Sequence, residues 1–222
     1  MRYLDLLTAL FATVLLVSNV ASTKLVVLGP FTFDGGTLLF PLAYIFGDVL
    51  TEVYGYRNSR RVSWTGFFAL LLATLTFQAV AHLPAPPDAE SQRFGEAFGL
   101  LLGLTPRIVL GSLLAYFLGE FANAYVLAKL KVRTEGRFFW LRALASTLVG
   151  QGLDTGVFLL VAFYGVFPKE VLLAVFLSNY AFKLGVEALM LPFTYAVVGF
   201  LKRAEGMDAY DRDTDFNPFR LT

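Results

Sequence analysis

Cysteine is absent from this chain of 222 residues, and His82 is its single histidine. These absences exclude disulfides, thiolate metal sites and cysteine nucleophiles, and one chain cannot form a two-histidine metal site. The hydrolase signatures His-Glu-x-x-His and Gly-x-Ser-x-Gly are also missing. So is the Gly-x-x-x-x-Gly-Lys-Ser/Thr loop that cradles nucleotide phosphates. We therefore expect a protein that is not an enzyme, with no catalytic residue, metal, cofactor or ATP hydrolysis of its own.

Charged residues are scarce as well. They make up 16% of the chain, whereas an average soluble domain has about 25%. Hydrophobic residues make up 57%, and the mean hydropathy is +0.65. A water-soluble protein of this composition would expose a mostly apolar surface, which a lipid bilayer can solvate. The net charge of +1 gives no indication of a nucleic-acid partner, and none is expected. The composition predicts a membrane protein.

Six stretches are apolar and long enough to cross the hydrocarbon core, which needs about 20 residues. These stretches are Tyr3–Ser22, Thr37–Val53, Arg61–Leu83, Pro106–Ala128, Leu141–Tyr164 and Glu170–Leu201. The first is not read as a signal peptide, because it lacks a cleavage pattern and further spans follow it. We predict an all-α membrane protein with six transmembrane helices. Residues 1–204 would form a single transmembrane domain, and residues 205–222 a polar, loosely ordered cytoplasmic tail.

Two connecting segments have patterns of their own. Between the first two spans, short extended runs flank Gly29-Pro30 and end at Asp34-Gly35, which predicts a small hairpin or a re-entrant cap. Between the third and fourth spans, residues 89–103 place Phe94, Phe98 and leucines on one side. That pattern predicts an interfacial amphipathic helix.

The basic residues predict the orientation. Thirteen of the eighteen lie at the N-terminus, in the second and fourth loops and in the tail, four lie in the other loops, and Lys183 lies within a span. Lysine and arginine concentrate in cytoplasmic loops. Both termini are therefore expected in the cytoplasm, which requires an even number of spans. The chain is predicted to be a multi-pass protein of the inner (plasma) membrane.

Polar side chains recur at helical spacing within the predicted spans. They are Tyr44, Asp48 and Glu52 in the second span; Tyr116, Glu120 and Asn123 in the fourth; Gln151 and Asp154 in the fifth; and Asn179, Lys183 and Glu187 in the sixth. A charge at the bilayer centre costs roughly 2.5–3.5 kcal/mol on insertion scales, so such groups usually face the bundle interior. Four helices would each present one polar stripe. Together the stripes predict a wet central cavity that binds a small solute.

Purely structural explanations exist for several of these residues. Lys183 and Glu187 can neutralise each other one turn apart, and Glu52 can anchor its helix at the lipid headgroups. Asp48, like Ser18-Asn19 at the end of the first span, can serve helix–helix hydrogen bonding.

Asp154 is the strongest functional candidate among them. It has no basic partner on its own predicted helix, and Gly150, Gly152 and Gly156 lie nearby. Glycines at this spacing let another backbone or a ligand come close.

The block Gly47-Asp48-Val49-Leu50-Thr51-Glu52-Val53-Tyr54-Gly55-Tyr56-Arg57 resembles the queuosine precursor transporter family, also called the vitamin uptake transporter-like family. The same order of features continues through Ser18-Asn19 to Lys24, Gly35-Gly36-Thr37 with Phe40-Pro41, Arg60-Arg61 and Asn179-x-x-x-Lys183. The resemblance covers nearly the whole chain. It implies import of a 7-deazaguanine base, the precursor of the modified tRNA base queuosine.

This implied substrate suggests roles for the polar residues. Its guanine-like edge has a ring N–H beside an amino group, which a carboxylate such as Asp154 or Glu187 can accept together. The ring carbonyl needs a donor, and the flat ring an aromatic or apolar slot such as one containing Tyr44. The complete set of expected substrate-binding residues is Asp154, Gln151, Asn179, Lys183, Glu187, Asn19, Tyr44, Asp48, Glu120 and Asn123.

Several alternatives stay open at this point. The leading hypothesis is a stand-alone importer that works by alternating access or facilitated uptake, with proton coupling through Asp154, Glu120 or Glu187 unresolved. A second is a membrane subunit that binds a related base or vitamin and relies on a separate ATPase module. An intramembrane hydrolase using a carboxylate pair such as Asp48 and Asp154, and a structural assembly factor, are further alternatives. The oligomeric state, including a homodimer, is not determined.

Overall fold

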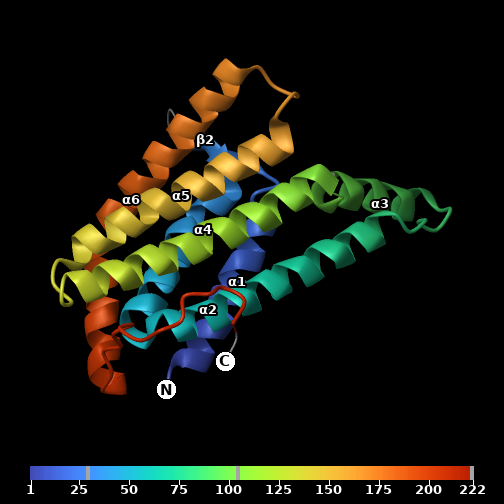
Figure 1. The fold of residues 1–222 in the computed structure, drawn as a ribbon. Helices are drawn as coiled ribbons and strands as arrows, with labels where there is room; N and C mark the ends of the chain where they lie inside the picture. Colours follow the sequence, from blue (N-terminus) through green and yellow to red (C-terminus); the bar gives the residue numbers. More distant parts are fainter. Residues whose placement is uncertain (29–30, 104–105, 221–222) are drawn as a thin grey trace.

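The computed structural model describes residues 1–28, 31–103 and 106–220 (Figure 1). Its elements, in chain order, are α1 (Leu4–Ala21), β1 (Leu25–Leu28), β2 (Phe31–Asp34), η1 (Gly35–Leu38), α2 (Phe40–Ala81), α3 (Ala89–Leu102), α4 (Pro106–Arg133), α5 (Phe139–Phe163) and α6 (Lys169–Glu205). Within the described residues, α1, α2, α4, α5 and α6 are long and apolar enough to cross a membrane. The predicted all-α class is confirmed.

Large apolar side chains cover the outside of these helices. Leu72 of α2 and Leu189 of α6 are 69% and 80% exposed. Such residues would be unfavourable in water, but a bilayer solvates them, and helices satisfy their own backbone hydrogen bonds in lipid. The exposed apolar surface therefore fits the five membrane-length helices.

The predicted second and third spans lie in one element, α2, which is interrupted at Gly55. This residue has φ 79° and ψ 167°, a conformation that glycine adopts readily and other residues rarely do. Figure 1 shows α2 turning sharply where its colour passes from light blue to teal. The basic residues Arg57, Arg60 and Arg61, which were expected in a loop, lie instead in the first turns of the second arm, residues 56–81.

The segment between α1 and α2 forms the predicted hairpin. Strands β1 and β2 pair antiparallel, with Leu25 opposite Asp34 and Leu28 opposite Phe31. The expected turn at Gly29-Pro30 lies outside the described residues. The backbone N–H of Gly35 donates to the carbonyl of Lys24 over 2.8 Å, which closes the hairpin against the end of α1.

Helix α3 is also found where a helix was predicted. Asp88 caps its start, accepting a hydrogen bond of 2.8 Å from the backbone N–H of Ser91. No described residue of α3 is buried, and Phe94 is 69% exposed. Its Phe98 ring contacts Phe77 of α2 at a centroid distance of 6.2 Å. The position of α3 at a membrane interface stays a prediction.

Both ends of the chain lie at the same end of the bundle (Figure 1). The carboxylate of Glu205 accepts hydrogen bonds from the backbone N–H groups of Arg2 and Tyr3, at 2.8 and 2.7 Å. The apolar core lies toward this end and joins all five long helices, with Phe11, Val53, Leu127, Ala143 and Val198 among its buried members. The termini are therefore fixed to the best-packed part of the molecule.

The C-terminal segment 206–220 packs against the interruption of α2, so the prediction of a loosely ordered tail is wrong. Asp211 is buried, and its two carboxylate oxygens share a bifurcated hydrogen bond from the backbone N–H of Tyr56, at 3.1 and 2.9 Å. Arg60 donates to the carbonyls of Asp215 and Asn217, at 2.8 and 2.6 Å. The tail thereby pairs backbone groups that the break at Gly55 leaves without a partner inside the helix, the N–H of Tyr56 and the carbonyl of Val53.

Candidate functional site

A network of charges closes the bundle at the end that holds the termini. Glu52 of α2 is 1% exposed and accepts two hydrogen bonds from Arg142 of α5, at 2.5 and 3.2 Å. Lys202 of α6 reaches the same carboxylate at 2.7 Å, and Lys131 of α4 lies 3.6 Å from it. We call Glu52, Lys131, Arg142, Lys202 and Asp208 the charge network. Since Glu52 is buried, the idea that it anchors α2 at the headgroups is wrong.

Asp208 connects this network to the tail. It accepts hydrogen bonds from Lys131 and from Lys202, the latter at 2.9 Å. Partial burial alone would raise the pKa of Asp208, but the two lysine hydrogen bonds outweigh it and hold the pKa below its usual value. The carboxylate therefore stays ionised and neutralises part of the surplus positive charge.

A second group of polar residues lies deeper in the bundle. Asp48 of α2 and Asn123 of α4 are each 2% exposed, and the Asn123 side-chain amide donates to the Asp48 carboxylate over 3.2 Å. Glu120, one turn earlier on α4, accepts a long hydrogen bond of 3.4 Å from Ser63 of α2. The polar stripes predicted on α2 and α4 therefore face each other.

Helices α5 and α6 complete this group. Thr147 of α5 donates to Glu187 of α6 over 2.6 Å, and Gln151, one turn further along α5, is fully buried. Lys183 lies 3.2 Å from the carboxylate of Asp154, whose partner thus comes from the neighbouring helix. Lys183 thus has an ion-pair partner on the neighbouring helix.

Close helix packing brings these stripes together. A methyl group at Gly150 of α5 would lie 2.8 Å from the Cβ of Asn123, and one at Gly119 of α4 would lie 2.8 Å from the Cβ of Asp154. Small residues at such crossings let the backbones approach. Tyr44 of α2 lies in the neighbourhood of four carboxylates, those of Asp154, Glu120, Glu187 and Asp48. We call Tyr44, Asp48, Glu120, Asn123, Gln151, Asp154, Lys183 and Glu187 the polar cluster.

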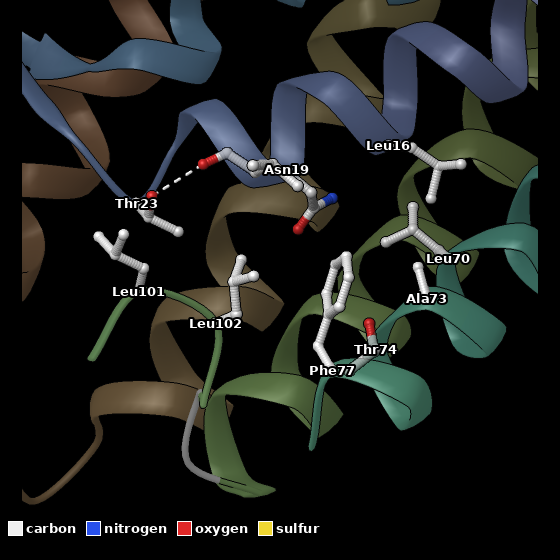
Figure 2. Close-up of a pocket in the computed structure, with 10 residues that line it drawn as sticks. Leu16, Asn19, Thr23, Leu70, Ala73, Thr74, Phe77, Leu101 and Leu102 are labelled. Atoms are coloured by element: carbon white, nitrogen blue, oxygen red, sulfur yellow. Dashed lines mark hydrogen bonds between the residues drawn. The ribbon is translucent and has the colours of Figure 1, made fainter. Parts of the chain in front are cut away.

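Two of the ten expected residues lie outside the polar cluster. Asn179 is exposed on α6, one turn before Lys183. Asn19 points into a separate cavity of about 120 Å³ between α1, α2 and the end of α3 (Figure 2). Phe77, Leu102 and other mostly apolar residues line this cavity. The role of Asn19 in substrate binding stays a prediction.

Sequence reasoning missed several polar partners. Thr147 holds the Glu187 carboxylate, and its place one turn before Gln151 was a readable signal. Arg142 and Lys202 were counted only as basic residues of cytoplasmic segments, but they hold Glu52. No sequence signal indicated these contacts, because they join residues 90 and 150 positions apart.

Comparison with known proteins agrees with the family resemblance found in the sequence. The profile of the family described as "Putative vitamin uptake transporter" matches residues 34–197. A "Probable queuosine precursor transporter" of Bacillus subtilis (strain 168) is 36% identical over 188 residues, which cover 84% of this chain and 80% of the relative. The "Queuosine precursor transporter" of Escherichia coli (strain K12) is 26% identical over 168 residues, 73% of this chain and 71% of the relative. No solved structure shows detectable similarity to this chain.

Proposed function

The chain belongs to the vitamin uptake transporter family, and from this premise we propose that it imports a queuosine precursor, a 7-deazaguanine base, across the inner membrane. Its long apolar helices make it a multi-pass membrane protein. The names of its relatives support the class of substrate. The base would serve the salvage of queuosine in tRNA, and nothing in the proposal requires a cofactor or a nucleic-acid partner.

The observation that carries this proposal is the polar cluster. It combines four carboxylates with one ammonium group, from four helices that are long and apolar enough to cross a membrane, where ionisable groups are unfavourable. A purely structural protein would gain stability by replacing such groups with apolar ones. Binding of a polar guest explains why they are present, and a planar base with several N–H groups suits a site rich in carboxylate and amide oxygens.

We propose six membrane crossings with both termini in the cytoplasm. The two arms of α2, residues 40–54 and 56–81, would each cross, and the break at Gly55 would lie at the cytoplasmic surface. This arrangement is supported by the adjacent termini and by Arg60, Lys131 and Lys202, which lie at the same end of the bundle.

Transport would proceed by alternating access to the polar cluster. On the cytoplasmic side, the charge network joins α2, α4, α5 and α6 and would have to separate for release. On the outer side, the Asp154–Lys183 pair is partly exposed, with 28% and 18% of the side chains accessible, and would separate to admit the base. Gates on opposite sides of one site are what alternating access requires.

Uptake by the purified chain tests this proposal. We expect liposomes that contain this chain alone to accumulate labelled 7-deazaguanine, and cells that cannot synthesise the base to recover queuosine in tRNA when they express it. Uptake that appears only with an added ATPase module would replace the stand-alone importer by a substrate-binding subunit. Failure in both systems would exclude the proposed substrate.

A further inference from the structure

Buried polar atoms without hydrogen-bond partners are concentrated in the polar cluster. Among the described residues, five buried side-chain atoms have no partner, and four of them belong to Gln151, Asn123 and Glu187. The fifth, Nε of Arg60, lies beside the tail. More than about 90% of buried polar groups in native proteins are paired, so four unpaired atoms at one place need an explanation.

The three residues come from helices that pack together, Asn123 from α4, Gln151 from α5 and Glu187 from α6. Glu187 is held by Thr147, which lies one turn before Gln151 on α5. Gly150, the neighbour of Gln151 in the chain, packs directly against Asn123. The side chains of Gln151, Asn123 and Glu187 are 0%, 2% and 7% exposed. These values place all three in the interior, between α4, α5 and α6.

The unpaired atoms have defined hydrogen-bonding capacities. The amide of Asn123 donates to Asp48, which leaves its Oδ1 as an acceptor. One oxygen of Glu187 accepts from Thr147, which leaves Oε2 as an acceptor. Gln151 keeps both parts of its amide, one acceptor and one donor side by side. The group therefore offers three acceptor atoms and one donor atom.

We infer that these four atoms form hydrogen bonds with the edge of a guanine-type base. This inference specifies how the substrate is bound, and it rests on the proposed function. Such an edge carries one carbonyl, one ring N–H and an amino group with two N–H bonds, and so has three hydrogens to donate and one carbonyl acceptor. The amide of Gln151 pairs with the carbonyl and the ring N–H, as glutamine does with adjacent donor and acceptor atoms of other bases. Oε2 of Glu187 and Oδ1 of Asn123 accept the two hydrogens of the amino group.

This arrangement makes the amino group the main determinant of specificity. A base without it leaves the oxygens of Glu187 and Asn123 buried and unpaired, and sites built around such hydrogen bonds strongly reject analogues that lack them. Asp154 does not contact the base in this binding mode, because its carboxylate is already paired with Lys183. Glu187 is therefore the carboxylate that contacts the base.

The inference is tested by the affinity of the full-length chain, purified in detergent, for two probes. These are 7-deazaguanine and 7-deazahypoxanthine, which differ only in the amino group. We expect the wild type to prefer 7-deazaguanine on the order of 100-fold, and Glu187→Met to lower this preference to below about threefold. Glu187→Met should stay folded, because an apolar side chain of similar size replaces a carboxylate that has an unpaired buried oxygen. Glu170→Gln, at the exposed start of α6, is the matched control.

A second variant keeps the test valid if Glu187→Met does not fold. Thr147→Val retains the carboxylate of Glu187 but removes the hydroxyl that orients it. The preference for 7-deazaguanine should then lie between that of the wild type and that of Glu187→Met. Wild-type preference in a folded Glu187→Met protein, or equal binding of both probes by the wild type, would overturn the inference and leave import of the base intact. Failure of the wild type to bind either probe would overturn both proposals.

Discussion

The guanidinium of Arg142 binds the carboxylate of Glu52 through two hydrogen bonds, at 2.5 and 3.2 Å, and each side chain is 1% exposed. This pair joins α5 to α2 at the end of the bundle that holds the termini, and Lys202 of α6 adds a third contact to the same carboxylate. When an arginine donates two hydrogen bonds to one carboxylate, the relative orientation of the two side chains is fixed as well as the distance between them. The charge network therefore holds the relative positions of the helices that form the polar cluster.

Glu52→Gln should destabilise the protein strongly, because it leaves Arg142 buried without its counter-charge. Removing one partner of a buried ion pair costs about 3–5 kcal/mol. Denaturation in detergent should show this loss. Arg220→Gln is the control, because its pair with Asp215 is mostly exposed, at 60% and 46%, and it should change stability little. Equal effects of the two changes would contradict the assigned role of Glu52.

Gly150→Ala should weaken the crossing of α4 and α5. The added methyl group would lie 2.8 Å from the Cβ of Asn123, and overpacking of this kind costs about 1–3 kcal/mol. Gly199→Ala on α6 meets no atom within 4 Å and should be neutral or slightly stabilising. Thermal unfolding of both variants in detergent checks this, and a lower Tm for the Gly199 variant alone would refute it.

Asp211→Ala should detach the tail from the break in α2. The carboxylate caps the backbone N–H of Tyr56, and loss of a helix cap costs about 0.5–2 kcal/mol. The indole N–H of Trp64 donates to the carbonyl of Pro218, so its fluorescence should report the release. Asp213→Ala, at an exposed position of the same segment, should leave both stability and fluorescence unchanged.

Asp154→Asn should reduce uptake by roughly tenfold or more, because it leaves Lys183 without its ion-pair partner at the outer side of the polar cluster. Transport of labelled base into liposomes measures this. The double variant Asp154→Asn with Lys183→Gln should recover stability but not transport, because both gating charges are then absent. Normal uptake by the single variant would remove Asp154 from the transport mechanism.

The contribution of Asp208 to the stability of the folded protein should depend on pH. Because its pKa is lowered in the folded protein, its stabilisation is complete above the ordinary aspartate pKa and is lost as the pH falls through the lowered value. The wild type should therefore be more stable than Asp208→Asn at about pH 6, and the difference should shrink toward about pH 3. A difference in Tm that grows on acidification would have the wrong sign.

The membrane-spanning segments could be predicted because length and hydropathy decide them locally. The interruption of α2 could not, because a single glycine with a positive φ replaces the expected loop. The tail was mistaken for a loose segment because its composition is polar. Its order depends on contacts with Tyr56, Arg60 and Trp64, which lie more than 150 residues earlier in the chain.

The candidate site was predictable in its parts but not in its pairings. Helical spacing places Asp48, Glu120 and Gln151 on inward faces, and the structure brings these faces together. The sequence could not show that Lys183 would bind Asp154 across two helices, since a partner one turn away on its own helix satisfies the same rule. Asn19 was predicted to belong to the site because it lies in the family-like segment Ser18-Asn19. The structure places it at the separate cavity where α1 packs against α2.

The central claim is that the polar cluster is where the base binds, and the position of a bound base tests it most directly. An experimental structure of the full chain with 7-deazaguanine should show the ring between α4, α5 and α6, with its carbonyl and ring N–H on the amide of Gln151. A base found instead in the separate cavity between α1, α2 and the end of α3, beside Asn19 and Phe77, would contradict the account.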